Sequence, residues 1–506
     1  MKILKILIGV VVAGAAATAL LYLALTSEWA ADRVRLRMVA FLEDRFDADV
    51  EIGEITIALV PKVAIEGRRM TLTRVNGSRV PFIRLDNFSV GGWPLDLLRR
   101  HLSDVTVDGF ELRVERGVRR APGTPSMTRH DVTIDRVVVR NGLLLIVPNN
   151  PEKLPLQFDL QEVVMEDFGF DRSSPYRARL TNPKPRGSID STGRFGPWVT
   201  DNLRLTPLSG GYTFDNADLS TIKGIGGTLT STGKFDGILE RVHVRGVTST
   251  PDFHLDLTGQ PVALNTRFDA VVDGTTGDTA LQEVDATLGQ SRIVAKGLVA
   301  GQPGAKGRTI ALAVKIDEGK FEDFMTLTVK AAEPPMRGQL GVDATFDLPP
   351  GEADVPQRLQ LEGTFRLGQG QFTSDTVQER IDEMSRRGRG QPKNQDVQNV
   401  LSTFGGTFRM RDGVLRLPQL QFRVRGAAVD LAGSYRLQQE ALDFAGTLKL
   451  DASLSQTTTG FKSLLLKAVD PFFRKSGAGA VLPIKVTGTV DQPAFGLDVR
   501  RVLSRR

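Results

Sequence analysis

The sequence predicts a mostly β protein, in which an N-terminal transmembrane helix precedes an elongated antiparallel sheet and a few short helices. Three observations support this fold class. The run from Ile6 to Leu25 carries no charge, short apolar runs of period two recur along the rest of the 506 residues, and 51 glycines accompany only 7% aromatic residues. Frequent glycine between short alternating runs is typical of many strands, turns and bends.

Composition and charge exclude several classes of protein. With 41% hydrophobic and 25% charged residues, the chain has the usage of a globular protein and is not wholly disordered. The absence of cysteine excludes a disulfide scaffold, cysteine-ligated zinc and a thiol nucleophile. A net charge of +6 is too dilute over this length to indicate nucleic-acid binding, so no nucleic-acid partner is expected.

The uncharged run near the N-terminus predicts a membrane anchor in region 1–27. At 1.5 Å per residue, about 20 helical residues span roughly 30 Å, the thickness of the hydrocarbon core of a bilayer. A cleaved signal peptide is the alternative, but the apolar run continues beyond the small residues at 15–19, which favours an uncleaved anchor. The expected anchor residues are Ile6, Leu7, Ile8, Leu20, Leu21, Leu23 and Leu25.

Strands and a few helices are expected in three further regions, 28–200, 201–362 and 363–506. The first region begins with an amphipathic helix over Glu28–Phe46, after which the apolar period changes to two. Other helices are expected over Thr373–Arg387, with Ser374 as its cap, over Gln395–Phe404 and over Gly460–Lys475. The segment 182–186 is expected to be a loop.

A loose motif of glycine, any residue and an apolar residue recurs within the strand pattern. It predicts bulges or bends where the sheet curves, with plain hairpin turns as the alternative. Its copies begin at Gly193, Gly227, Gly233, Gly363, Gly406, Gly433, Gly446 and Gly488.

The alternating strands raise a question of coverage, because each has an apolar face that must be covered by something. The few expected helices are not sufficient, so the cover is either a second sheet or a bound apolar ligand. The alternation is clearest near the C-terminus, and these residues are the candidates for an apolar groove that binds acyl chains: Leu415, Leu417, Leu420, Phe422, Val424, Val429, Leu431, Leu442, Phe444 and Leu448.

Motifs for chemistry are weak. The four histidines form no zinc-binding spacing. Residues 273–278 have calcium-ligand residue types but lack the ligand series of an EF-hand, so a plain turn is favoured. We therefore expect no enzyme activity, no metal and no cofactor. A positive C-terminal tip is a candidate for contact with an anionic membrane surface, with an ordinary charged terminus as the alternative; its residues are Arg500, Arg501, Arg505 and Arg506.

The chain resembles the AsmA-like family of inner-membrane-anchored envelope proteins. The resemblance begins with the anchor, the amphipathic helix and the segment Val50–Ile55. It continues through Gly193–Trp198 and Thr206–Phe214, and it includes a C-terminal region from about Gly363 to Val499 that closes with Leu482–Val490 and Gln492-Pro493.

This resemblance implies a single-pass protein of the bacterial inner membrane, with a cytoplasmic N-terminus and a periplasmic β-rich body that serves outer-membrane biogenesis. AsmA-like proteins are related to bridge-like lipid transfer proteins, which implies a curved β-groove that binds or transfers phospholipid or another acyl-chain lipid between envelope membranes. Two alternatives remain: a scaffold or regulator of outer-membrane protein assembly, which would bind envelope assembly proteins, and an enzyme acting on envelope glycans or lipids.

Overall fold

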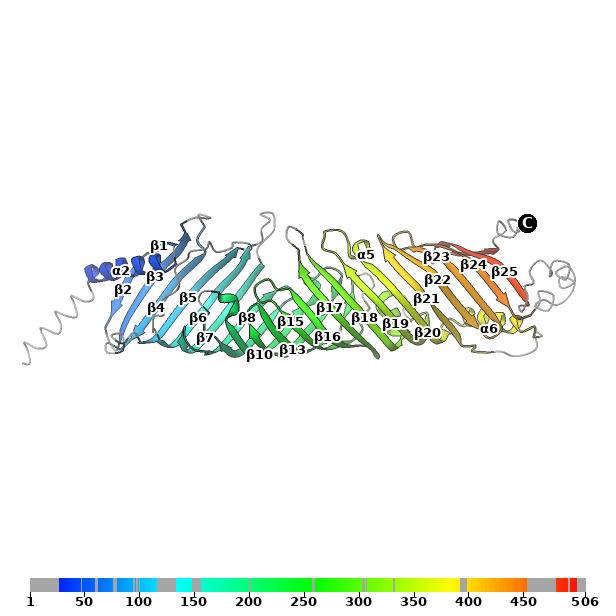
Figure 1. Cartoon of the computed structure of the whole chain (residues 1–506), viewed down its shortest axis with the longest axis horizontal. Coiled ribbons are helices and arrows are strands. Elements are labelled where there is room, and N and C mark those ends of the chain that lie inside the picture. The colour runs from blue at the N-terminus through cyan, green and yellow to red at the C-terminus, as the bar shows by residue number, and fades with distance from the viewer. Residues whose placement is uncertain are drawn as a thin grey trace, which may run out of the picture. The chain divides into compact units, whose positions relative to one another are not determined.

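The structure is a computed structural model (Figure 1). The expected anchor residues between Ile6 and Leu25, the expected helix Gly460–Lys475 and the terminal arginines from Arg500 onward lie outside the residues that it describes. The described residues are 27–46, 48–59, 62–75, 80–93, 96, 99, 101–115, 133–147, 156–199, 202–256, 260–302, 305, 307–330, 333–391, 398–452, 479–489 and 492–497. Among them, no helix combines the length and the apolar character needed to cross a bilayer.

The chain forms two compact units. The first comprises residues 1–218 and 230–244, and the second comprises 219–229 and 245–506. Strands β12 (Thr228–Ile238) and β13 (Arg241–Thr250) extend across this division. The three β regions expected from the sequence, with boundaries after residues 200 and 362, stay a prediction.

The first unit is a sheet that begins with a helix on one face. Helix α2 (Glu28–Phe46) has the bounds expected from the sequence. A short 3-10 helix, η1 (Leu203–Leu205), follows β9. The strands are β1 (Ala48–Ile52), β2 (Ile55–Ala58), β3 (Val63–Arg74), β4 (Ile83–Gly92), β5 (His101–Glu115), β6 (Thr133–Val147), β7 (Leu156–Gly169), β8 (Ser174–Pro183), β9 (Arg186–Phe195) and β10 (Pro207–Asp218).

Strand pairing in this unit follows the chain order. Both β1 and β2 pair with β3, and each later strand pairs with the next one. The pairs are antiparallel except β5 and β6, which are parallel. The expectation of a wholly antiparallel sheet is therefore wrong at this pair. Parallel neighbours need a connection of about a dozen or more residues, and residues 116–132 supply that length.

The core of the first unit lies where α2 crosses the sheet. Its buried residues come from β1 to β4 and include Val50, Ile52, Leu72 and Phe88. The partly buried hydrophobic residues that pack against them include Ala31, Met38, Val39 and Leu42 of α2. The helix thus covers the apolar face of the first strands.

The second unit contains a longer run of strands, which lie side by side from β15 to β25 in Figure 1. All pairs from β15 to β26 are antiparallel. The elements before β19 are η2 (Leu219–Thr221), β11 (Ile225–Gly226), β14 (His254–Leu255), β15 (Leu264–Val272), β16 (Thr279–Leu288), β17 (Ser291–Gly301), β18 (Arg308–Lys320) and α4 (Phe321–Thr328). The remaining elements are β19 (Met336–Leu348), α5 (Val355–Arg358), β20 (Gln360–Phe372), α6 (Asp375–Gly388), β21 (Ser402–Arg411), β22 (Val414–Val424), β23 (Ala427–Arg436), β24 (Ala441–Leu450), β25 (Ala480–Thr489) and β26 (Pro493–Leu497).

The two long helices of the second unit lie at one end of the strands. Helix α4 connects β18 to β19, and α6 connects β20 to β21. Because the strands are antiparallel, both connections lie at the same end of the strands. The opposite end has shorter connections, including the one that contains α5. Figure 1 shows α5 and α6 at opposite ends of the strands.

Two of the expected helices fall wholly or partly in described residues of the second unit. The helix expected over 373–387 is α6, and Ser374 is its N-cap residue, although the Ser374 side chain makes no capping hydrogen bond. Of the helix expected over Gln395–Phe404, residues 395–397 lie outside the described residues, and the rest is wrong, because 398–401 are not helical and β21 begins at Ser402. Phe404 instead pairs with Leu367 on one side and Phe422 on the other, so burial across the sheet outweighs the local helical pattern.

Most glycines of the recurring motif lie inside strands, and some of them oppose aromatic residues. Gly193 is paired with Tyr176, and Gly363 is paired with Phe408, both in regular register. Neither a bulge nor a hairpin turn therefore occurs at Gly193 or Gly363, and the expected bend of the sheet stays a prediction there. Gly433 is paired with Phe444 and borders a bulge in β22 between Leu417 and Leu420. The loop expected at 182–186 is shorter in the structure: only Lys184 and Pro185 form the turn, because β8 continues to Pro183 and β9 begins at Arg186.

Candidate functional site

The ten candidate groove residues all lie on one face of three adjacent strands. In β22 and β23, Leu420 pairs with Leu431 and Phe422 pairs with Val429. In β23 and β24, Val429 pairs with Leu448, and Gly433 pairs with Phe444. Leu417 and Leu420 are three residues apart, so in a regular strand they would lie on opposite faces. The bulge between them places Leu415 and Leu417 on the same face as Leu420. We call this side of the strands of the second unit the apolar face.

The apolar face extends well beyond these ten residues. Register pairs join Leu312 to Phe346, Val342 to Phe365, and Phe365 to Gly406, so the same side remains apolar from β18 to β21. It continues in the other direction to β25, where Ile484 pairs with Gly446. The candidate residues chosen from the sequence lie only in β22 to β24, although the period-two pattern that identifies this face is also present in the earlier strands.

Aromatic rings contact one another along this face. The Phe404 and Phe422 ring centroids are 4.6 Å apart, and those of Phe372 and Phe404 are 6.3 Å apart. Phe365 and Phe408 are also neighbours, at 6.3 Å. These rings provide a large apolar surface with no polar group to satisfy.

The opposite side of the same strands is charged. In β22, Arg416, Gln421 and Arg423 alternate with the apolar residues and are exposed. Cross-strand ion pairs occur on this side, including Lys449 with Asp430 at 2.6 Å and Arg409 with Glu362. The hydrogen bond from Arg409 holds the pKa of Glu362 below its ordinary value. The sheet therefore has one charged face, which water solvates, and one apolar face.

Helices α4 and α6 cover the apolar face at one end of the strands. Val424, Ala427 and Leu450 are buried there, with Ile381 and Met384 of α6 packed against them. At the same end of β19 and β20, Phe321 and Phe324 of α4 pack near Met336, Leu340 and Leu367. Farther along the strands the side chains are less covered: Leu415, Leu417, Leu420 and Leu431 are only half-buried. Helices thus cover the apolar face at one end of the strands, and the rest of the face is partly exposed.

Buried polar contacts fix α6 in place. Asp382 accepts hydrogen bonds from the backbone N–H groups of Asn399 (2.9 Å) and Val400 (2.8 Å), and from Gln378 Nε2 (2.8 Å). The Ser385 hydroxyl donates to the Arg425 carbonyl at 2.6 Å. These bonds hold the helix against the strand ends, which fixes the covered edge of the apolar face.

The sheet of the first unit also has an apolar face, but hydroxyl groups interrupt it. Leu85 pairs with Phe110 and Val139 pairs with Val163. On β8 to β10, the Tyr176 and Ser191 hydroxyls lie 3.0 Å apart and the Ser191 hydroxyl donates to the Gly211 carbonyl, while the Tyr212 hydroxyl lies 3.1 Å from that of Ser231. Burial raises the pKa of Tyr176 and the hydrogen bond with Ser191 lowers it by less. Tyr176 is therefore a neutral hydrogen-bonding group at neutral pH.

A cavity of about 690 Å³ lies on the charged side of the first unit, near β1 and β3 to β5. Its lining includes Glu51, Arg69, Arg84, Glu111 and Arg113. The arginines already have carboxylate partners: Arg113 Nε lies 3.2 Å from Glu111, and Arg84 Nε lies 3.4 Å from Asp86. The cavity therefore has a mixed, internally paired lining.

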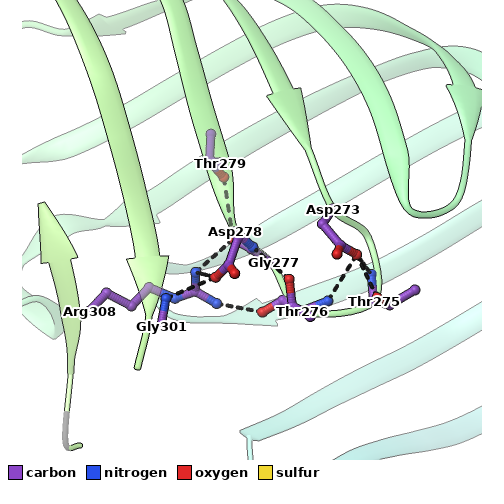
Figure 2. Close-up of polar contacts among 8 residues, drawn as sticks. All are labelled: Asp273, Thr275, Thr276, Gly277, Asp278, Thr279, Gly301 and Arg308. Carbon is purple, nitrogen blue, oxygen red and sulfur yellow. Dashed lines mark hydrogen bonds and ion pairs between the residues drawn. The ribbon is translucent and has the colours of Figure 1, made fainter. Parts of the chain in front are cut away.

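The candidate calcium loop at 273–278 is the turn between β15 and β16, and its polar groups bind one another (Figure 2). Asp273 Oδ1 accepts from the Thr275 and Thr276 N–H groups at 2.7 and 3.2 Å. Burial raises the pKa of Asp273, but the hydrogen bonds from Thr275 and Thr276 together lower it by more. The pKa of Asp273 therefore lies below its ordinary value.

Asp278 in the same turn is bound by groups from the neighbouring hairpin. Its Oδ1 accepts from the Gly301 N–H at 2.8 Å and from Arg308 Nη1 at 3.0 Å (Figure 2). Arg308 also donates to the carbonyls of Thr276 and Gly277. The Arg308 guanidinium therefore supplies the positive charge that faces these oxygens, and its bonds link the turn to the neighbouring hairpin.

Histidine and carboxylate clusters add no metal site within the described residues. His101 Nε2 lies 2.9 Å from Asp135, and its Nδ1 lies 2.8 Å from the Thr133 hydroxyl. His254 Nδ1 lies 2.9 Å from the Asp252 carbonyl, and its ring occupies the space beside Gly226. Both rings have local partners that account for their positions.

Comparisons of the chain with protein-family models, curated proteins and solved structures find no match. The apolar face of the second unit, which helices cover only at one end of the strands, is the candidate ligand site among the described residues.

Proposed function

We propose that this chain is an AsmA-like, inner-membrane-anchored protein of the bacterial envelope, with a cytoplasmic N-terminus and a periplasmic body. Its function is to bind phospholipid or another acyl-chain lipid on the apolar face and to transfer it along a curved β-groove in outer-membrane biogenesis. The single observation that carries the proposal is the register from β15 to β25, which aligns apolar residues on one side while leaving many of them half-buried.

Acyl chains fit the chemistry of this face. Each methylene that leaves water for an apolar surface contributes about 0.8 kcal/mol, so a long chain is held firmly without a specific polar contact. The face repeats similar leucine, valine and phenylalanine positions from strand to strand. Neighbouring binding positions are therefore close in free energy, and a lipid can slide between them. The charged opposite face keeps the sheet solvated while the lipid is bound.

Native mass spectrometry of the full-length protein after mild extraction tests the proposal. We expect phospholipid to remain bound to the unmodified chain and to be lost from the double variant Leu417→Asp/Phe422→Asp, because two buried charges oppose acyl-chain binding. The matched control, Gln419→Asp/Gln421→Asp, places the same charges on the opposite side of the same strand, and we expect it to retain lipid.

A lipid-free protein would contradict the proposal. So would equal lipid in the two double variants, because the bound lipid would then lie elsewhere. Lipid-free chains that instead retain envelope assembly proteins through the apolar face would favour the scaffold alternative.

A further inference from the structure

Helix α2 has an outward face that its own sheet does not cover. Its inward residues Ala31, Met38, Val39 and Leu42 pack on the first strands. On the other side, Trp29 is 70% exposed and Leu36 is 63% exposed. Exposed apolar side chains of this size, on a helix that already buries its opposite side, call for a second contact surface.

The outward residues form one stripe. Trp29, Arg33, Leu36 and Ala40 follow one another at helical spacing, and all four are exposed. The Arg33 guanidinium lies 5.4 Å from the centre of the Trp29 ring. Arg37 is also exposed beside the stripe. On its other side lie Asp32, which is paired with Arg35 at 3.0 Å, and Glu43.

The composition of the stripe fits the interface of a bilayer. Tryptophan favours the level of the lipid headgroups because its ring is apolar while its N–H needs a polar partner. Arginine attracts anionic lipid headgroups when it lies near the membrane surface. The chain also places the helix there: the uncharged run ends at Leu25 and α2 begins at Glu28, so the first turn of α2 lies within a few residues of the expected membrane span.

We propose that the outward stripe of α2 lies on the surface of the lipid bilayer in which the chain is anchored, so that this helix joins the membrane to the first strands of the sheet. This inference rests on the membrane anchor of the proposed function, but it does not depend on lipid transfer. With its inward side on β1 to β4, α2 would fix the end of the first sheet at the membrane surface instead of leaving it on a free tether.

Tryptophan fluorescence of the full-length protein in nanodiscs tests the inference. The chain has three tryptophans, so Trp93→Phe/Trp198→Phe leaves Trp29 alone. We expect phosphatidylglycerol nanodiscs that contain lipids brominated near the headgroup to quench more than half of the Trp29 emission. The control variant, Trp29→Phe/Trp93→Phe, leaves Trp198, whose ring is surrounded by Phe168, Phe170 and Phe195. We expect its emission to be unchanged.

The outcomes separate this inference from the anchor itself. If the protein enters the nanodisc but Trp29 is quenched only by aqueous acrylamide, the stripe faces water and the inference is overturned while the anchor stands. If the protein does not enter the nanodisc, the anchor fails and the inference fails with it. Reduced lipid quenching in Arg33→Glu/Arg37→Glu, with the protein still in the disc, would support the role of the arginines.

Discussion

Single glycines on the apolar face determine how closely the strands approach. A Cβ atom at Gly433 would lie 2.2 Å from the Asp443 carbonyl oxygen and 2.6 Å from Cδ1 of Phe444. A Cβ at Gly406 would lie 2.1 Å from the Gln419 carbonyl oxygen. The two carbonyl oxygens are backbone atoms, which cannot rotate away as a side chain can. The glycines therefore leave room both for the adjacent strand and for the aromatic ring opposite.

Gly433→Ala is expected to destabilise the second unit by about 1–3 kcal/mol, the usual range for overpacking. Thermal unfolding of the full-length protein, followed by circular dichroism, measures the change. Gly368→Ala is the matched control, because nothing lies within 4 Å of a Cβ at that position. Equal midpoints for the two variants would show that the close approach at Gly433 has no energetic consequence.

Ion pairs on the charged face predict a pH dependence. Hydrogen bonds from Arg409 and Arg292 lower the pKa values of Glu362 and Asp285, respectively, in the folded protein. A lowered folded-state pKa contributes stability above the unfolded-state value, and this stability is lost as the pH falls through the folded-state value. The unfolding midpoint should therefore fall with acid, and more gently in Glu362→Gln/Asp285→Asn. Parallel curves for the two proteins from pH 6 to about pH 3 would contradict this assignment.

At the residue scale, the sequence predicted which side chains share the apolar face but not how the glycines act. The alternation of Leu420, Phe422 and Val424 is sufficient to place them together. The contact between Gly433 and Phe444 depends on pairing between separate strands. Because that register is set by tertiary structure, no local pattern around Gly433 indicates the ring opposite.

Helix α6 covers one end of the apolar face and is held there by a small set of buried hydrogen bonds. Asp382 is only 8% exposed and accepts two backbone N–H groups from the segment that precedes β21. The sequence predicted this helix, and its residues Ile381 and Met384 pack against the buried ends of the strands. It did not predict the role of Asp382, because a carboxylate in a helix is ordinarily solvated.

Asp382→Asn is expected to loosen α6, because one of the backbone donors would face an amide N–H and lose its acceptor, at a cost of about 1–3 kcal/mol. Hydrogen exchange of the amides of Asn399 and Val400 reports this loosening directly. Glu379→Gln, at an exposed position of the same helix, is the control and should leave the exchange unchanged. Unaltered protection in Asp382→Asn would mean that packing alone holds the helix.

The same approach explains the elements that the sequence predicted incorrectly. The parallel pair of β5 and β6 was missed because strand direction depends on the length and path of the connection, and alternation within a strand carries no directional signal. The helical pattern expected over Gln395–Phe404 is wrong over 398–404, where Phe404 lies in β21 and contacts the rings of Phe422 and Phe372.

Over the whole molecule, the strands of each unit present one apolar side, and each unit has helices at part of that side. Composition and alternation predicted the β class and the one-sided strands. The division into two units depends on contacts between distant residues, which alternation alone does not reveal. The function rests on what occupies the uncovered part of the apolar face, and it is there that the account is most open to direct test.

Site-specific photocrosslinking in living bacteria tests this central claim. A photoreactive phenylalanine analogue replaces Phe422, on the apolar face, or Gln421, the next residue on the opposite side of β22. After growth with radiolabelled phosphate and irradiation, we expect labelled phospholipid to be attached to the protein at position 422 and not at position 421. Labelling that is absent at both positions, or equal at both, would contradict a lipid-binding apolar face.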